Sequence, residues 1–572
     1  MAYDGITMAA VCRELNEKLV GARVEKIHQP HKLEIYIHLR SRDSQVVLTC
    51  SADARLGRVH LTRLKAENPA AAPAFCMLLR KHLGGARLLA VEQSGLDRVL
   101  ILAFRGYDDF GTETKKYLIC EVMGKHSNII LAAGDRNLKQ ILGSAKIITA
   151  QMSRHRTVTP GAPYLPPPLQ SKLELHGISE EALAQVLIQQ AEGAPEQLLV
   201  ASVMGIGIEI SRELIFRATG GENTHPLDVV RSLTIELRRL DESLRTGSLE
   251  PCIAHSPDGR THICSPIRLT RLPATWLTSY SSVNEALDQY YTDIIQTKNI
   301  DEQRNRLHQT AHARFSRIYK KQTLQEKELR EMQGADRLRI SGEIITANLR
   351  AIRPGAREAV LQNFYSPELA TISIPLDPSI SAQANAQRYF KKYRKLKDGE
   401  TVLKRRLDET KNELAYLESL LASLEYADLE SLQEIRGEME QSGLMRAVTA
   451  KKARQPAVSS PLHFTSAEGI DIYVGRNNMQ NDRLTLKTSA PEDTWLHTKD
   501  IPGAHVIIKN TDPPEGTLIE AAKLAVRYSR AAASSNVPVD YTHVKHVRKP
   551  RGAKPGMVIY SHQRTLYVAA DD

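Results

Sequence analysis

The residues LKDGETVLKRRLDETKNELAYLESLLASL, from Leu396 to Leu424, decide how this chain is organised. Mostly apolar side chains recur there at spacings of four and three, with charged residues filling the remainder, at Leu403, Leu407, Thr410, Leu414, Leu417, Leu421 and Leu424. This spacing is typical of a coiled coil. The stretch therefore predicts a long helix that packs along a second one.

An earlier stretch, residues 283–332, supplies the expected partner helix. It carries charged residues around Leu307, Ala311, Ile318, Leu324 and Leu329. The two stretches should pair antiparallel, and a 50-residue helix would reach about 75 Å. Between them, residues 363–365 and 371–378 predict short strands and turns. Residues 283–445 should therefore form a coiled coil that carries a small middle module.

Residues 1–172 are expected to form an α+β sheet domain. Their pattern predicts helices at residues 6–19 and 73–83, and strands at residues 22–28, 33–39, 44–50, 87–92, 98–104, 116–123 and 127–131. A proline-rich segment at residues 163–168 should close this domain.

Residues 175–282 read as mainly helical. Gly205-Ile-Gly207 lies between two helical segments, which is the pattern of a helix-hairpin-helix. In such a turn, backbone N–H groups can bind a phosphate. The same pattern also fits a plain corner between helices that uses glycine for tightness. The residues leave both interpretations open.

Residues 446–572 should form a final α+β domain after a linker at about residues 446–462. Within it, DTWLHTKDIPGAHVIIK from Asp493 to Lys509 predicts a sharp turn after Asp500 and a new strand from His505. The turn should bring His497, Lys499, His505 and Lys509 near one another. From residue 541 to residue 570 there is no acidic residue, whereas six lysines and arginines stand among three tyrosines. Cations among aromatic rings suit RNA; the candidate RNA-binding residues are Trp495, His497, Lys499, His505, Arg548 and Lys549.

The composition narrows the class of protein. A chain of 572 residues should fold as several modules, and its net charge of +11 favours an acidic partner. There is no run of eighteen apolar residues and the first residues do not resemble an export signal, so we expect a cytoplasmic protein without a membrane partner. Its six scattered cysteines should be reduced and buried.

The sequence offers no clear catalytic or metal-binding set. Cys252, His255, His262 and Cys264 have ligand chemistry, but their spacing does not match the common zinc knuckle, and a hairpin explains them more simply. No phosphate-binding glycine loop and no nucleophile motif is present. We therefore expect no metal, no cofactor and no catalytic residue.

Two polar breaks in the N-terminal strands are candidate contact sites. Asp97 and Arg98 precede an apolar strand. They are either an ion pair at the end of the strand, or a site in which Asp97 orients the Arg98 guanidinium toward a phosphate. Residues 121–128, EVMGKHSN, are a solvated turn or a second contact surface. The cationic stretch RYFKKYRKLK, residues 388–397, fits a coiled-coil face and also suits RNA.

Four motifs in order resemble the NFACT family over essentially the whole chain. They are GLDR at residues 95–98, EVMGKHSN at 121–128, NAQRYFKKY at 385–393 and DTWLHTKDIPGAHV at 493–506. The resemblance implies an N-terminal domain similar to that of formamidopyrimidine-DNA glycosylases, a helix-hairpin-helix, a coiled coil with a middle module, and an RNA-binding C-terminal domain. It also implies tRNA-binding residues at Asp97, Arg98, Glu121, Lys125 and His126.

The resemblance further implies a role on stalled ribosomes. A member of the family would bind the 50S subunit that still carries peptidyl-tRNA, contact 23S rRNA, recruit tRNA(Ala), and direct mRNA-independent alanine tailing of the nascent chain for degradation. A small RNA-binding protein of the Hsp15 type is the expected helper. The ribosome would form the peptide bond, so the chain itself is not expected to be an enzyme.

Two other functions fit parts of the sequence. The family has been described as fibronectin-binding, which would make the chain a surface adhesin; cell fractionation distinguishes this. The fold implied for the first domain also allows a DNA glycosylase or lyase, which borohydride trapping on abasic DNA would reveal.

Overall fold

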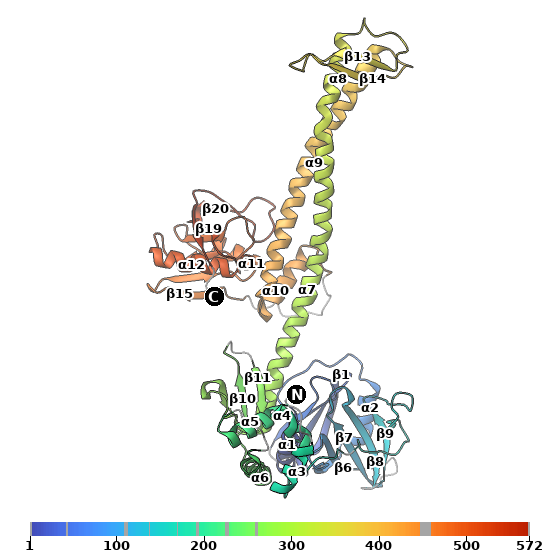
Figure 1. Cartoon of the computed structure of the whole chain (residues 1–572), viewed down its shortest axis with the longest axis vertical. Helices are drawn as coiled ribbons and strands as arrows, with labels where there is room; N and C mark the ends of the chain where they lie inside the picture. Colours follow the sequence, from blue (N-terminus) through green and yellow to red (C-terminus); the bar gives the residue numbers. More distant parts are fainter. Residues whose placement is uncertain are drawn as a thin grey trace. The chain divides into compact units, whose positions relative to one another are not determined.

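The computed structural model describes residues 3–569, apart from residues 42–43, 108–111, 136–137, 169, 190–193, 223–227, 258–260, 447–458 and 533. The chain divides into two compact units, residues 1–297 and 298–572. Figure 1 labels their helices and strands.

The first unit is built around a nine-stranded antiparallel sheet in the order β4-β3-β2-β1-β5-β6-β7-β8-β9. Helices α1 and α2 pack on it through buried residues such as Leu15 and Leu79. The bounds are α1 Gly5–Leu19, β1 Arg23–His31, β2 Glu34–Arg40, β3 Gln45–Ser51, β4 Arg58–Thr62, α2 Ala74–Leu83, β5 Arg87–Gln93, β6 Val99–Tyr107, β7 Glu113–Glu121, β8 Asn128–Asp135 and β9 Leu138–Ser144.

The helices and strands predicted in residues 1–131 are confirmed, but β4 and β9 were missed. Strand β4 contains Arg58, which is 2% exposed and pairs with Glu34 at 2.5 Å. A buried ion pair gives no apolar alternation, so the pattern of a strand is hidden there. Strand β9 contains Gly143, which lowers its strand propensity.

Four further helices and a small sheet complete the first unit. Their bounds are α3 Glu180–Gln189, α4 Pro195–Ser202, α5 Ile208–Thr219, α6 Val230–Thr246, β10 Cys252–His255, β11 Thr261–Ser265 and β12 Leu277–Ser279. The hairpin predicted between Cys252 and Cys264 is confirmed by the pairing of β10 with β11. All six cysteines are free, and Cys12 alone among them is not fully buried.

The predicted coiled coil is present, and most of it belongs to the second unit. Helix α7, Val283–Met332, packs along α9, Ala382–Glu425, with Leu307 beside Leu424 and Ile318 beside Leu414. Early residues of α7 therefore meet late residues of α9, as antiparallel pairing requires (Figure 1). One prediction was wrong: Leu324 is 58% exposed, because the neighbouring Gln325 is buried in its place.

The middle module and two shorter helices flank this pair. The module consists of α8 Asp336–Ala347 and the paired strands β13 Glu358–Gln362 and β14 Thr371–Pro375, around a core that includes Ile344 and Ile374. After α9, a helix that was not predicted separately, α10 Leu429–Gln441, packs back on α9 through Leu432 and Ile435. Most of the expected linker, residues 447–458, lies outside the described residues.

The C-terminal domain has a six-stranded sheet in the order β15-β16-β18-β17-β19-β22. Helix α12 packs on one face, and Leu484, which follows α11, packs near Trp495. The bounds are β15 Leu462–Thr465, β16 Asp471–Val474, α11 Asn478–Arg483, β17 Thr494–Thr498, β18 Val506–Ile508, α12 Glu515–Arg527, β19 Val537–His543 and β22 Arg564–Val568. A separate pair joins β20 Val547–Arg548 to β21 Ile559–Tyr560.

The predicted turn between two strands is confirmed as the connection of β17 to β18. The positive φ falls on Asp500, at 55°, and not on Gly503. Gly503 is needed for space instead, because a Cβ atom there would lie 2.8 Å from the Ser529 Cβ. Lys509 lies at the far end of the hairpin, where it pairs with Asp493 at 2.7 Å, so the prediction that it lies near Lys499 was wrong.

The observed fold is thus mixed α/β, with a large N-terminal sheet, long helices and a C-terminal sheet domain. The domain bounds 1–172, 175–282, 283–445 and 446–572, and the glycosylase-like and helix-hairpin-helix labels, stay predictions.

Candidate nucleic-acid interface

The two polar breaks predicted in the N-terminal sheet lie at the same end of it. Val99 pairs with Glu121 across β6 and β7, and Glu121 pairs with Asn128 across β7 and β8. The turn that contains Asp97 and Arg98 therefore adjoins the turn after Glu121. The Arg98 carbonyl accepts a hydrogen bond from the Val122 N–H at 2.9 Å, which ties the two turns together.

Hydrogen bonds between side chains and the backbone hold the Asp97–Arg98 turn in place. The Asp97 carboxylate accepts a hydrogen bond from the Arg98 N–H at 2.7 Å, and the Gln93 amide donates to the Asp97 carbonyl at 2.8 Å. Gln93 also donates to the Gly5 carbonyl at 2.9 Å. Both Asp97 and Arg98 are partly exposed, so their side chains remain within reach of a ligand.

The turn also contacts the start of α1 and the turn between α4 and α5. The Asp4 carboxylate accepts from the Thr7 N–H at 2.8 Å and from the Gly207 N–H at 2.9 Å. A Cβ atom on Gly5 would overlap the Leu96 carbonyl, and one on Gly207 would overlap Asp4. We call this convergence of residues 4–5, 95–98 and 205–207 the glycine junction.

The glycine junction helps to decide whether the Gly205-Ile-Gly207 turn binds a phosphate or only allows close packing. A carboxylate oxygen of Asp4 already accepts the Gly207 N–H, which is a donor a phosphate would use. Burial raises the pKa of Asp4, whereas its two backbone hydrogen bonds and the charge of Arg98 oppose that rise. The structure therefore favours the packing interpretation at this amide.

Lys125 and His126 are exposed in the short 3-10 turn of residues 124–126, whereas Glu121 is completely buried. The Glu121 carboxylate receives two hydrogen bonds from Arg156, at 2.6 and 2.5 Å, and one from the Tyr164 hydroxyl at 3.0 Å. A bidentate, buried pair of this kind fixes the end of β7. Glu121 can thus support the neighbouring turn, while Lys125 and His126 can reach a ligand.

Lys172 is a candidate contact residue that the sequence did not indicate. Burial lowers its pKa and the positive charge of Arg98 lowers it further, whereas the negative charge of Asp97 opposes this. Its ammonium donates to the Val200 carbonyl at 2.9 Å. No local motif marks Lys172, because the fold brings it to Arg98 from a distant part of the chain.

In the C-terminal domain, Trp495, His497 and His505 form an aromatic cluster in the interior. Trp495 is 0% exposed; its ring stacks on His497 at 5.7 Å and meets the edge of His505 at 5.3 Å. Burial lowers the pKa of His497 to about 4 and that of His505 well below its usual value. Both imidazoles are therefore neutral at pH 7, and they cannot supply positive charge to RNA.

The remaining candidates of this domain lie at or near the surface. Lys499 and Arg548 are exposed, and Lys549 is partly exposed and pairs with Asp482. Further exposed side chains continue the basic and aromatic character predicted for residues 541–570: Arg551, Lys554, Arg564 and Tyr567. This surface has the chemistry that phosphates and unstacked bases bind.

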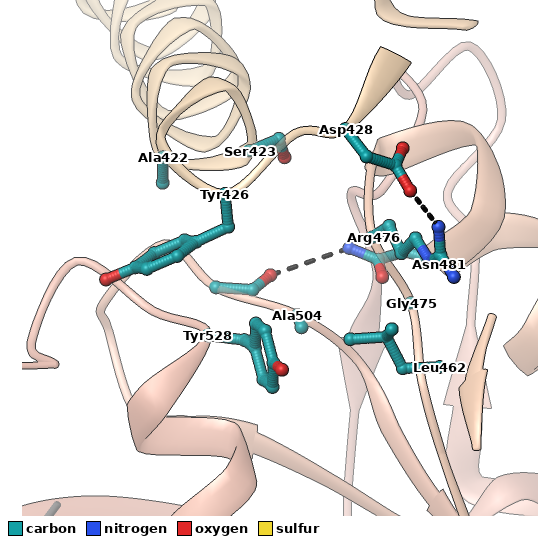
Figure 2. Close-up of a pocket in the computed structure, with 11 residues that line it drawn as sticks. Ala422, Ser423, Tyr426, Asp428, Leu462, Gly475, Arg476, Asn481, Ala504 and Tyr528 are labelled. Atoms are coloured by element: carbon teal, nitrogen blue, oxygen red, sulfur yellow. Dashed lines mark hydrogen bonds and ion pairs between the residues drawn. The ribbon is translucent and has the colours of Figure 1, made fainter. Parts of the chain in front are cut away.

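A pocket of about 180 Å³ lies between the end of α9 and the C-terminal sheet. Figure 2 places the rings of Tyr426 and Tyr528 beside it, with Arg476 and Asn481 across from Tyr426. Sequence patterns could not find this pocket, because its walls come from segments far apart in the chain.

No group of three or more His, Cys, Asp or Glu side chains that could hold a metal ion occurs in the described part of the chain. Within that same part, none of the helices has the length and apolar character needed to span a bilayer.

Comparisons with known proteins agree with the motifs. Residues 4–457 match the model of the NFACT N-terminal and middle domains, and residues 461–561 match the NFACT protein RNA binding domain. The Rqc2 homolog RqcH of Bacillus subtilis is 35% identical over 100% of this chain and 98% of its own length. RqcH of Streptococcus pneumoniae is 32% identical with the same coverage.

A shorter match reaches a eukaryotic protein. The ribosome quality control complex subunit 2 of Schizosaccharomyces pombe is 29% identical over 24% of this chain and 13% of its own length. Two family models cover most of the sequence, and a relative matches it from end to end, so this chain belongs to the NFACT family, alongside the bacterial Rqc2 homologues named RqcH.

Proposed function

We propose that this protein acts in ribosome quality control, as an adaptor that positions tRNA on a large ribosomal subunit whose translation has stalled. The observation that carries the proposal is the end-to-end similarity to RqcH together with the matched RNA-binding domain. The Asp97–Arg98 turn adjoins the turn that carries Lys125 and His126, which supports the proposal, because cations on neighbouring turns suit a folded polyanion.

In the proposed cycle, the protein binds the 50S subunit that retains peptidyl-tRNA and recruits tRNA(Ala). The Asp97–Arg98 turn engages tRNA, while the basic surface around Arg548 and Lys549 contacts 23S rRNA. Alanines are then added to the nascent chain without mRNA, and the tail marks the chain for degradation. A small RNA-binding protein of the Hsp15 type assists.

The protein is not itself an enzyme in this proposal. The peptidyl transferase centre of the ribosome forms each peptide bond, so the protein needs no nucleophile, base or metal of its own. Its contribution is to hold the reacting tRNAs in place, and positioning alone can lower a barrier substantially.

Recovery of the tagged protein from cells with stalled translation tests this proposal. At modest ionic strength, sequencing of the bound RNA should find 23S rRNA and enriched tRNA(Ala), and mass spectrometry should find 50S proteins. A reporter that lacks a stop codon should acquire C-terminal alanines only when the protein is present. Recovery without rRNA or tRNA, or untailed reporter in cells that contain the protein, would contradict it.

A further inference from the structure

The pocket between α9 and the C-terminal sheet has two aromatic walls. Tyr426, the residue that follows α9, is 51% exposed, and its ring meets that of Tyr528 at 5.9 Å and 74°. Phe464 lies beyond Tyr528 at 6.4 Å. An exposed tyrosine ring at the mouth of a pocket offers a stacking surface for a planar group, and every nucleobase has such a face.

The wall across from Tyr426 is polar and fixed in orientation. The Arg476 guanidinium pairs with Asp428, and the Asn481 carbonyl oxygen accepts a hydrogen bond from the His505 N–H at 3.1 Å. The Asn481 amide N–H groups therefore point away from His505. The hydrogen bond that they donate to the Gly503 carbonyl is long, at 3.5 Å (Figure 2). Guanidinium and amide N–H groups can donate to the ring nitrogens and carbonyl oxygens of a base edge.

The volume of the pocket suits one small planar group. About 180 Å³ corresponds to roughly six water molecules, at ~30 Å³ each in the liquid. A folded peptide element or an RNA helix would not enter such a space, whereas a single base turned out of its stack would.

Cations neighbour the pocket residue Tyr528 in the chain and could receive a sugar-phosphate chain that leaves the pocket. Arg527 and Arg530 flank Tyr528 and are exposed. Arg530 pairs with Glu418 at 3.1 Å, with side chains 62% and 31% exposed, and an exposed pair of this kind exchanges easily for a phosphate. Lys523, one turn earlier on α12, borders a neighbouring hollow with Phe464 and Leu524.

From these four observations we propose that the pocket holds one unstacked base of single-stranded RNA, with its ring against Tyr426 and Tyr528 and its edge toward Arg476 and Asn481. The proposal deepens the proposed function, because it rests on RNA binding by residues 461–561 and assigns that binding a base-holding site.

The test uses the full-length protein and a fluorescein-labelled single-stranded 12-mer RNA. Tyr426→Ala should weaken binding about tenfold, since stacking on an aromatic ring contributes on the order of 1–3 kcal/mol per base. Tyr426→Phe keeps the ring and should bind like the unchanged protein. Tyr319→Ala, at an equally exposed tyrosine of α7, serves as the matched control and should have no effect.

Salt dependence separates stacking from phosphate contacts. Tyr426→Ala should reduce affinity by the same factor at every salt concentration, because no ionic contact is lost, whereas Arg527→Ala should also make the salt dependence shallower. With 4-thiouridine in the 12-mer, ultraviolet crosslinks should map to peptides that contain Tyr426 or Tyr528.

Two failures can be told apart. If the unchanged protein binds no RNA, both the proposed function and this pocket assignment fall. If it binds RNA but Tyr426→Ala binds within twofold of it, and crosslinks map elsewhere, only the pocket assignment falls. The second result would leave the pocket to a ligand of another class, such as a protein side chain.

Discussion

At the scale of single residues, Arg98 is the cation whose loss should matter most. Arg98→Ala should reduce the tRNA that co-purifies with the protein about 10- to 100-fold, since a hydrogen bond to a charged group contributes about 1.5–3 kcal/mol. Arg98→Lys should restore it only in part, because an ammonium lacks the planar fork of a guanidinium. Quantitative tRNA sequencing after purification measures the change.

The matched control is Arg105→Ala, an exposed arginine near the other end of β6. It should leave the bound tRNA unchanged. Equal tRNA recovery from Arg98→Ala and Arg105→Ala would remove Arg98 from the interface.

The glycine junction makes a second prediction about single residues. Gly207→Ala places a methyl group against the Asp4 carboxylate and should destabilise the first unit by about 1–3 kcal/mol. Gly437→Ala in α10, where a Cβ atom meets nothing within 4 Å, should instead be neutral or stabilising by up to about 1 kcal/mol. Urea unfolding followed by circular dichroism compares the two, and an equal stability of both variants would argue against the junction.

The sequence revealed some of these residues and hid others. Asp97 and Arg98 are neighbours that interrupt an apolar strand, so a local pattern was enough to single out this turn, and its role in binding stays a prediction. Trp495 and His505 looked like surface contacts, but both faces of β17 and β18 are covered, and coverage by distant segments is invisible in a local pattern. Asp4 bonds the Gly207 amide, and Lys172 interacts with the charge of Arg98, only because the fold brings these distant residues together.

At the scale of elements, the contact of α10 with α11 contains a buried carboxylate. Glu438 is 2% exposed and accepts a hydrogen bond from the Asn478 amide at 3.1 Å. Burial raises its pKa from 4.5 to about 7. Because the pKa of Glu438 is higher in the folded than in the unfolded state, its protonated carboxyl contributes to the stability of the fold. This contribution is fully present below pH 4.5 and is lost as the pH rises through about 7.

The size of this effect can be measured. A shift of this magnitude corresponds to about 3 kcal/mol between the two protonation states, so the second unit should be less stable at pH 8 than at pH 5.5. Glu438→Gln keeps an acceptor for Asn478 without the charge, and should flatten the pH dependence in thermal unfolding. Glu425→Gln, at an exposed position of α9, should keep the dependence of the unchanged protein; a flat profile there too would refute the assignment.

The long helices were the most predictable elements, because a heptad repeat over many turns leaves little ambiguity. The exception, Leu324, lies late in α7, where a polar residue takes the buried position. Short strands such as β4 have too few residues to show a clear alternation of apolar and polar side chains. In β4 the buried, paired Arg58 interrupts the alternation further.

At the scale of the whole molecule, the net charge of +11 should make RNA binding strongly dependent on salt. Each phosphate contact on single-stranded RNA contributes about −0.7 to the slope of log affinity against log salt. Arg548→Glu with Arg551→Glu should therefore reduce the slope by roughly 1.4 and weaken co-sedimentation with 50S subunits.

Arg405→Glu with Lys411→Glu changes the net charge equally, at exposed positions of α9. If this control lowers the slope as much as the first pair, binding follows total charge and not the C-terminal surface.

The glycine junction also has a consequence for how a new copy of the protein matures. Its three segments are synthesised at widely separated times, and the Gly207 amide is the last partner to emerge. Until that residue has left the exit tunnel, the loop bearing Arg98 lacks one of its supports. An unfinished copy would thus hold the Arg98 loop less firmly than a completed one, and if that loop engages tRNA as proposed, premature capture beside the ribosome that is making the copy would be limited.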